Sequence, residues 1–176
     1  MDEAYFHFSG KTFLPLLSHY ANLVILRTLS KAGFAAMRIG FLIASPALVH
    51  ELNKVRSPYN LNAFSQAAAC FCLDHDNELQ SQVREILRLR AALEQGLGHL
   101  EGVCAYPTDA NFIFFRCVFG ADRIYRELLG RGVLVKAFGG PESIRDCMRV
   151  TVGTAQENKE FIEAIKGALA EVRSVI

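Results

Sequence analysis

The chain has 176 residues and a formal net charge of +1 at pH 7, with 51% hydrophobic and only 21% charged residues. A nearly neutral chain offers no strongly basic surface, so neither nucleic acid nor an anionic membrane is expected as a partner. The apolar content suits one ordinary domain or two small lobes, and it is high enough to suggest a buried interface with a partner.

The chain opens on the segment DEAYF, residues 2–6, which is typical of the end of a strand and the turn after it. In a parallel α/β sheet the functional residues follow the carboxyl ends of the strands, and Asp2 and Tyr5 would occupy such an end. We therefore expect the chain to begin within a sheet. Residues 11–20 follow as a short helix or loop, because Pro15 limits the length of a helix there.

Two apolar runs, 23–26 and 39–44, lack alternation and predict strands that are buried on both faces. Between them lie a lysine, two hydroxyl residues before it and an arginine seven residues after it. A lysine amine forms an imine with an aldehyde once its pKa is lowered, while hydroxyls and an arginine make a phosphate cup. An aldehyde that carries a phosphate describes pyridoxal 5′-phosphate. The alternative is an ordinary surface lysine after a strand. The residues are Thr28, Ser30, Lys31 and Arg38.

Helical patterns dominate the next part of the chain. Ser45 fits the N-cap and Pro46 the first position of a helix that continues over 47–55. Apolar residues then recur at helical spacing from 63 to 98. The long helix is expected to lead from a first lobe, residues 1–75, which would be part of a larger cofactor-binding domain, into a second lobe, residues 76–176.

From Gly102 onward the pattern changes to short strands. They are expected at 103–106, 111–116, 132–136 and 148–152, with a helix over 121–131. Thr154 and Glu157 have the spacing of a capping box that opens a last helix. This order of elements predicts a small α+β domain.

The five cysteines have irregular spacing, form no C-x-x-C pair and do not cluster with the histidines. We expect buried, reduced thiols and no metal site. The chain start lacks a basic-then-apolar signal, and no apolar run approaches the ~20 residues of a membrane helix. A cytoplasmic protein is expected. The cysteines are Cys70, Cys72, Cys104, Cys117 and Cys147.

Several segments, in order, resemble the second half of the histidinol-phosphate aminotransferases, which are fold-type-I pyridoxal-phosphate aminotransferases. They are DEAYFHFSG, LVILRTLSKAGFAAMRIGFLIA, KVRSPYNLN, DANFIFFR, GVLVKAFG and MRVTVGTAQEN. The resemblance extends over essentially the whole chain. It implies an α/β fold: part of the large-domain sheet with its helices, followed by a small α+β C-terminal domain.

The resemblance assigns roles around the cofactor. Lys31 would hold pyridoxal phosphate and carry the proton of transamination. Asp2 would pair with the pyridine nitrogen so that the ring accepts electrons, the alternative being a solvated chain start. Tyr5 would hydrogen-bond the phenolic oxygen of the ring. The phosphate cup would consist of Thr28, Ser30 and Arg38.

Three positions of the second lobe match substrate-binding motifs of the family. Arg149 matches the arginine that clamps the substrate α-carboxylate; otherwise it is a strand arginine with a structural partner. Lys136 stands where many members carry an arginine for the phosphate of histidinol phosphate, and lysine keeps the charge but loses the bidentate geometry. Asn111 is a motif position with either a structural role or an active-site contact.

The resemblance implies transfer of an amino group between histidinol phosphate and 2-oxoglutarate in histidine biosynthesis, by homodimers with composite active sites. Because it covers only the second half of the family, we expect little or no activity from this chain alone. Aromatic amino acid aminotransferases and threonine-phosphate decarboxylases of the same fold are alternatives. A further alternative is a non-catalytic, folded oligomer, since an open sheet edge and an apolar face favour self-association.

Overall fold

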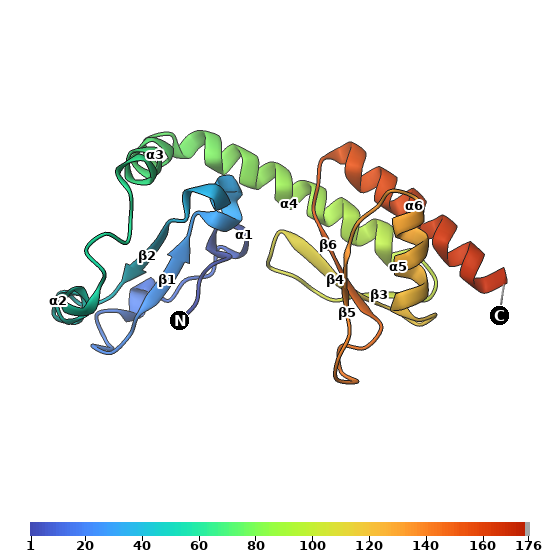
Figure 1. Ribbon diagram of the computed structural model, residues 1–176, viewed down its shortest axis with the longest axis horizontal. Coiled ribbons are helices and arrows are strands. Elements are labelled where there is room, and N and C mark those ends of the chain that lie inside the picture. Colours follow the sequence, from blue (N-terminus) through green and yellow to red (C-terminus); the bar gives the residue numbers. More distant parts are fainter. Residues whose placement is uncertain (175–176) are drawn as a thin grey trace. The chain divides into compact units, whose positions relative to one another are not determined.

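The computed structural model describes residues 1–174. The chain divides into two compact units, one that ends at Val83 and one that begins at Arg84 (Figure 1). The division falls within a long helix, α4 (Asp76–Gly98).

The first unit is built around the antiparallel strands β1 (Ile25–Thr28) and β2 (Gly40–Ile43). Residues 1–3 extend this sheet on the β1 side. The N–H of Leu26 donates to the carbonyl of Met1 at 2.9 Å, and the N–H of Glu3 donates to the carbonyl of Leu26 at 2.8 Å. The pairing is parallel, so the chain after Asp2 and the chain after Thr28 leave the sheet at the same edge.

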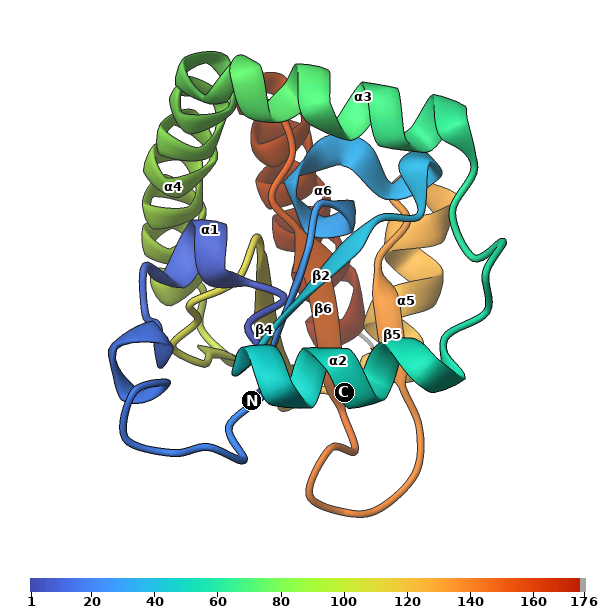
Figure 2. The ribbon, with the colours of Figure 1, turned by 90° about the vertical axis from the view of Figure 1, so that its left-hand side faces the viewer.

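Short helices surround this sheet: α1 (Phe6–Ser9), α2 (Pro46–Val55) and α3 (Ala63–Asp74). A 3₁₀ turn, Leu14–Leu16, occupies the segment that Pro15 was expected to limit. Ser45 caps α2, as predicted, by accepting from the N–H of Leu48 at 3.4 Å. Figure 2 shows an extended segment that joins α2 to α3.

The prediction that both strands are buried on both faces was wrong. Leu26 and Leu42 are paired in register and remain 47% and 43% exposed, whereas Ile25 is fully buried. β1 also begins later than expected, because the N–H of Leu23 closes a turn onto the carbonyl of Tyr20. An apolar run without alternation thus marks a sheet with two apolar faces, of which the described residues cover only one.

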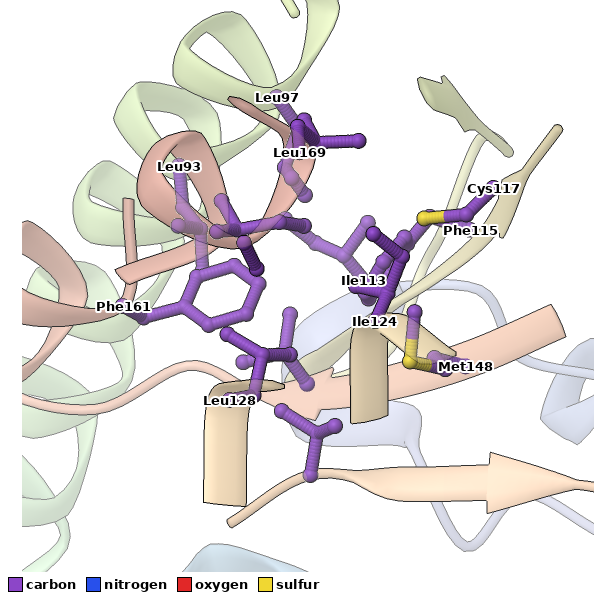
Figure 3. Packing of buried hydrophobic residues seen from close by; sticks show 14 of the residues in the cluster. Leu93, Leu97, Ile113, Phe115, Cys117, Ile124, Leu128, Met148, Phe161 and Leu169 are labelled. Carbon is purple, nitrogen blue, oxygen red and sulfur yellow. The ribbon is translucent and has the colours of Figure 1, made fainter. Parts of the chain in front are cut away.

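The second unit contains a four-stranded antiparallel sheet in the order β3-β4-β6-β5. Its strands are β3 (Val103–Ala105), β4 (Phe112–Cys117), β5 (Lys136–Phe138) and β6 (Cys147–Thr151). Two helices, α5 (Ala121–Gly130) and α6 (Ala155–Ser174), pack on the sheet together with the later part of α4. Figure 3 shows leucines and a phenylalanine of these helices meeting Ile113, Phe115 and Met148 of the sheet.

The strands of this sheet alternate between a buried and an open face. Ile113, Phe115 and Cys117 of β4 are fully buried, while the residues between them are only partly covered. The predicted capping box of α6 is confirmed: the N–H of Thr154 donates to Glu157 Oε2 at 2.7 Å, and the N–H of Glu157 donates to Thr154 Oγ1 at 3.2 Å.

The strand expected at 132–136 lies instead at Lys136–Phe138. Gly132 and Val133 belong instead to the turn that closes α5, because their N–H groups donate to the carbonyls of Leu129 and Leu128, respectively. Gly132 has φ +77°, a conformation that closes a helix and is open to glycine.

The cysteines are free, but not all are buried. Cys117 and Cys147 are buried, and burial raises the pKa of the Cys117 thiol to about 12. Cys70 and Cys104 are exposed, contrary to the expectation, because they lie on the uncovered sides of α3 and β3. Among the described residues no group of His, Cys, Asp or Glu is arranged to hold a metal ion, and no helix has the length and apolarity to cross a membrane.

Candidate active site

The ends of two parallel segments bring Asp2 and Tyr5 next to the loop that follows β1. Asp2 lies beside Leu26, and its Oδ1 accepts the N–H of Ala4 at 2.9 Å. This contact turns the chain toward Tyr5, which occupies the N-cap position of α1. The sequence prediction that Asp2 and Tyr5 follow a strand end therefore agrees with their positions.

Lys31 lies in a tightly wound loop between β1 and β2. Residues Ser30–Phe34 form a π-type turn, and Ala35–Met37 form a 3₁₀ turn. The turn is anchored by Leu29, which is 2% exposed and whose carbonyl accepts the N–H groups of Ala32 and Phe34 at 3.0 and 3.2 Å. Ala32 and Gly33 depart from helical geometry within this turn, and Gly33 has φ +100°, a conformation open to glycine.

The amine of Lys31 faces the ring of Tyr5. Its Nζ lies 5.6 Å from the ring centroid, and Lys31 is exposed to solvent. The structure thus brings together Lys31 and Tyr5, and it positions Asp2 on the neighbouring strand end. These are a nucleophilic amine, a phenol and a carboxylate at one sheet edge.

The residues expected to form a phosphate cup lie along the same loop. Thr28 Oγ1 donates to the carbonyl of Ile39 at 3.0 Å and accepts the N–H of Ser30 at 3.0 Å. This hydroxyl therefore holds the two ends of the loop together. Arg38 is exposed and has φ +55°, and it lies two residues before Gly40, the first residue of β2, which pairs with Thr28. Their contact with a phosphate stays a prediction.

Sequence reasoning missed an ion pair on the opposite side of the same strands. Glu3 is only 7% exposed, and its Oε2 lies 2.9 Å from a terminal nitrogen of Arg27. Burial alone would raise the pKa of the Glu3 carboxyl, but bonds from the Phe13 N–H, Arg27 and Thr12 outweigh it and hold the pKa below its usual range. Alternation puts Asp2 and Thr28 on one face and Glu3 and Arg27 on the other, but only the pairing of the two segments, which the sequence does not reveal, brings Glu3 to Arg27.

His7 is a second group that the sequence did not single out. Its Nδ1 is buried and has no hydrogen-bond partner among the described residues. Burial lowers the pKa of His7, and the positive charge of Arg27 lowers it further, while Asp76 opposes the shift. His7 therefore binds a proton less tightly in the folded chain than in the unfolded chain.

We expect the free energy of unfolding to decrease as the pH falls below about 6.5, the ordinary pKa of histidine, because protonation of His7 favours the unfolded chain. Above that value the contribution of neutral His7 is fully present. Urea unfolding over a pH series should show a smaller pH dependence in this window for His7→Asn than for the unmodified chain. His50→Asn, at an exposed position of α2, is the control. If the free energy of unfolding changed equally with pH in all three proteins, the expectation would be contradicted.

The open face of the second sheet carries the predicted substrate residues. Arg149 of β6 is paired in register with Lys136 of β5 on one side and with Phe114 of β4 on the other. Paired residues share a face, so the two cationic side chains are neighbours. The guanidinium carbon of Arg149 lies 5.1 Å from the ring centroid of Phe112, and Lys136 Nζ lies 6.0 Å from that of Phe138.

Within the described residues neither cation forms an ion pair with a carboxylate, and Arg149 Nε is buried there without a hydrogen-bond partner. Like charges directly across a sheet are destabilising, and a buried unpaired donor costs free energy. An anion bound between the side chains would offset both costs. The arrangement therefore suits a carboxylate or phosphate ligand.

Asn111 has a backbone role in the second unit. Its carbonyl accepts the N–H of Val152 at 2.9 Å, which continues the pairing of β4 with the chain after β6. Arg90 fixes the preceding residue by donating to the carbonyl of Ala110 at 2.7 Å. Whether the Asn111 side chain contacts a ligand stays a prediction.

Comparison with known proteins matches most of the chain to one family. Residues 1–165 match the family described as aminotransferase class I and II. Histidinol-phosphate aminotransferase 2 of Nitrosococcus oceani is 46% identical over 168 residues, which cover 94% of this chain and 47% of that protein. The chain spans about half the length of the curated relatives it matches.

Solved structures share the fold over nearly the whole chain. The histidinol-phosphate aminotransferase from Clostridium acetobutylicum matches with a TM-score of 0.87 and 23% identity, covering 97% of this chain and 53% of that one. That from Sinorhizobium meliloti, solved in complex with pyridoxal 5′-phosphate, matches with a TM-score of 0.83 and 23% identity, covering 99% and 48%. L-threonine-O-3-phosphate decarboxylase from Porphyromonas gingivalis matches with a TM-score of 0.83 and 23% identity, covering 96% and 54%.

Proposed function

This chain belongs to the aminotransferase class I and II family, and we propose that it carries the cofactor lysine of a pyridoxal-phosphate-dependent aminotransferase. The proposed reaction moves an amino group between histidinol phosphate and 2-oxoglutarate, in histidine biosynthesis. The observation that supports it most is the position of Lys31 Nζ, which lies 5.6 Å from the ring centroid of Tyr5, beside the strand end that bears Asp2.

The residues at this sheet edge fit pyridoxal phosphate. When bound, the cofactor supplies an aldehyde that joins a lysine amine and a ring that takes up electrons from the substrate. Lys31 would hold the cofactor at rest and move a proton at its Nζ once released. Asp2 would keep the ring nitrogen protonated, and Tyr5 would donate to the ring oxygen. Thr28, Ser30 and Arg38 would surround the phosphate.

In the second unit, Arg149 and Lys136 would bind the anionic groups of the substrates. A planar guanidinium suits the α-carboxylate of glutamate and 2-oxoglutarate, and its buried unpartnered Nε offers a donor for that purpose. Lys136 would supply a point charge for the phosphate of histidinol phosphate or for a second carboxylate. Asn111 is proposed as a further contact. Both substrates are small and anionic, in keeping with two adjacent cations.

We propose further that the active form is a cytoplasmic homodimer and that this chain alone has little or no transaminase activity. An active reference can be built by placing the amino-terminal half of the Nitrosococcus oceani relative before Met1. We call this fusion the hybrid enzyme. It should convert histidinol phosphate and 2-oxoglutarate, while the 176-residue chain should not. A hybrid enzyme that converts neither histidinol phosphate nor any other amino donor would contradict the proposed function.

Replacing Lys136 with arginine tests the proposed substrate. A bidentate, charge-assisted contact is stronger than a single one, so we expect Lys136→Arg to raise kcat/KM of the hybrid enzyme for histidinol phosphate by up to about tenfold, or 1.4 kcal/mol. The kcat/KM for phenylalanine, which lacks a phosphate, is the internal control and should change little. A larger gain for phenylalanine would favour the aromatic aminotransferase, and release of carbon dioxide from threonine phosphate would favour the decarboxylase.

The non-catalytic alternative rests on the exposed apolar pair Leu26 and Leu42. Such a face favours self-association. Light scattering of the 176-residue chain distinguishes the cases: a monomer would contradict the oligomer reading, whereas an oligomer without pyridoxal phosphate binding would support it over the enzyme.

A further inference from the structure

We propose that Glu3 and Arg27 form a positioning pair, which holds Asp2 and Tyr5 in place at the cofactor and leaves Asp2 as the one carboxylate presented to the ring nitrogen. The inference rests on the proposed cofactor site. It concerns two adjacent acidic residues, Asp2 and Glu3, that the sequence alone does not distinguish.

The two carboxylates point to opposite faces of the extended segment 1–3. Asp2 lies beside Leu26 in the parallel pairing, so it shares a face with Leu26 and with Thr28 two residues on. Glu3 is on the other face, where its side chain is 4% exposed and that of Arg27 is 18% exposed. Only Asp2 is therefore on the face that also carries the predicted phosphate residue Thr28.

The carboxylate of Glu3 is bound by groups of the chain itself. Its Oε1 accepts the N–H of Phe13 at 2.7 Å, and its Oε2 accepts Nε of Arg27 at 3.0 Å. The Thr12 hydroxyl lies 3.2 and 3.1 Å from the two oxygens and itself accepts from Arg27 at 2.9 Å. These donors use most of the acceptor sites of the carboxylate, and only 4% of the Glu3 side chain is exposed to a ligand.

The same arginine reaches both sides of Tyr5 along the chain. Arg27 binds Glu3, two residues before Tyr5, and its guanidinium carbon lies 3.5 Å from the ring centroid of Phe6, the residue after Tyr5. Tyr5 therefore lies between two points that are fixed to β1, and Asp2 directly precedes the first of them. Loss of the pair should let this segment move relative to Lys31, which lies three residues after the end of β1.

The test compares cofactor binding by the 176-residue chain and its variants, using pyridoxal 5′-phosphate itself as the probe. Titration by absorbance gives the dissociation constant, and a pH series gives the midpoint of the absorbance change of the lysine-bound cofactor. Circular dichroism at the same temperature shows that each variant is folded. The exposed pair Glu51–Lys54 of α2, 63% and 56% exposed, is the matched control.

We expect Glu3→Gln to weaken binding about tenfold or more, the effect seen when orienting partners of a bound group are removed, and to shift the pH midpoint of the absorbance change. Glu51→Gln should alter neither. Arg27→Gln should act like Glu3→Gln, and the double variant should be no weaker than the worse single variant, because the two residues act as one unit. If Glu3→Gln does not fold, Arg27→Lys takes its place, and we expect a smaller loss of binding from it because lysine keeps the charge but not the bidentate geometry.

A folded Glu3→Gln or Arg27→Lys variant with an unchanged dissociation constant and pH midpoint would overturn the inference, even if its melting temperature fell, since the pair would then be structural only. Failure of the proposed function looks different. In that case the unmodified chain itself would show no binding that depends on Lys31, and the inference would fall with it.

Discussion

Replacing Lys31 with alanine is expected to abolish the covalent attachment of pyridoxal phosphate and to lower the transaminase activity of the hybrid enzyme by at least about 10⁴-fold. The amine is the group that would join the cofactor and then move the proton, and positioned proton transfer alone contributes about 10²–10⁴-fold. The exposed position of the Lys31 side chain allows its truncation without leaving a cavity.

Absorbance spectra and initial rates measure both effects. Lys54→Ala, at an exposed lysine of α2, is the control and should keep the spectrum and the rate. Thermal unfolding of Lys31→Ala should match that of the unmodified protein, which separates chemistry from folding. A Lys31→Ala variant that still shows the lysine-bound absorbance would contradict the assignment.

Replacing Arg149 with methionine should lower kcat/KM of the hybrid enzyme for 2-oxoglutarate by about 10²–10³-fold. Truncating one partner of a desolvated charge pair costs about 2–5 kcal/mol, and each 1.4 kcal/mol is a factor of ten. Methionine preserves much of the apolar stem that lies near Phe112, so the loss is one of charge and hydrogen bonding.

The structure also predicts what this change does to stability. Arg149 faces Lys136 across the sheet and has a buried donor without a partner, so its removal should leave the melting temperature unchanged or slightly higher. A purely structural arginine would behave in the opposite way. Arg145→Met, in the exposed turn before β6, is the control and should retain activity. A destabilised but active Arg149→Met variant would contradict a substrate role.

Sequence patterns predicted the local features that depend on neighbouring residues. The N-cap at Ser45 and the capping box of Thr154 and Glu157 were recognisable because each is complete within a few positions. The loop that bears Lys31 was recognisable for the same reason. Local motifs carry their own hydrogen-bond partners, so tertiary packing changes them little.

Features that depend on contacts between segments far apart in the chain could not be predicted from the sequence. The exposed faces at Leu26 and Leu42 differ from the expected burial because an apolar run does not reveal which of its faces the chain covers. The shift of β5 arose because the closing turn of α5 competes for Val133. The Glu3–Arg27 pair joins residues 24 positions apart, and only the parallel pairing of two segments revealed it.

The most direct test of the central claim is chemical trapping of the cofactor. Borohydride reduction of the chain in the presence of pyridoxal 5′-phosphate, followed by proteolysis and mass spectrometry, identifies the lysine that holds it. We expect the phosphopyridoxyl group on the peptide that contains Lys31, and no such peptide from Lys31→Ala. Label on a different lysine, such as Lys11 or Lys54, or no stoichiometric label at all, would contradict the account.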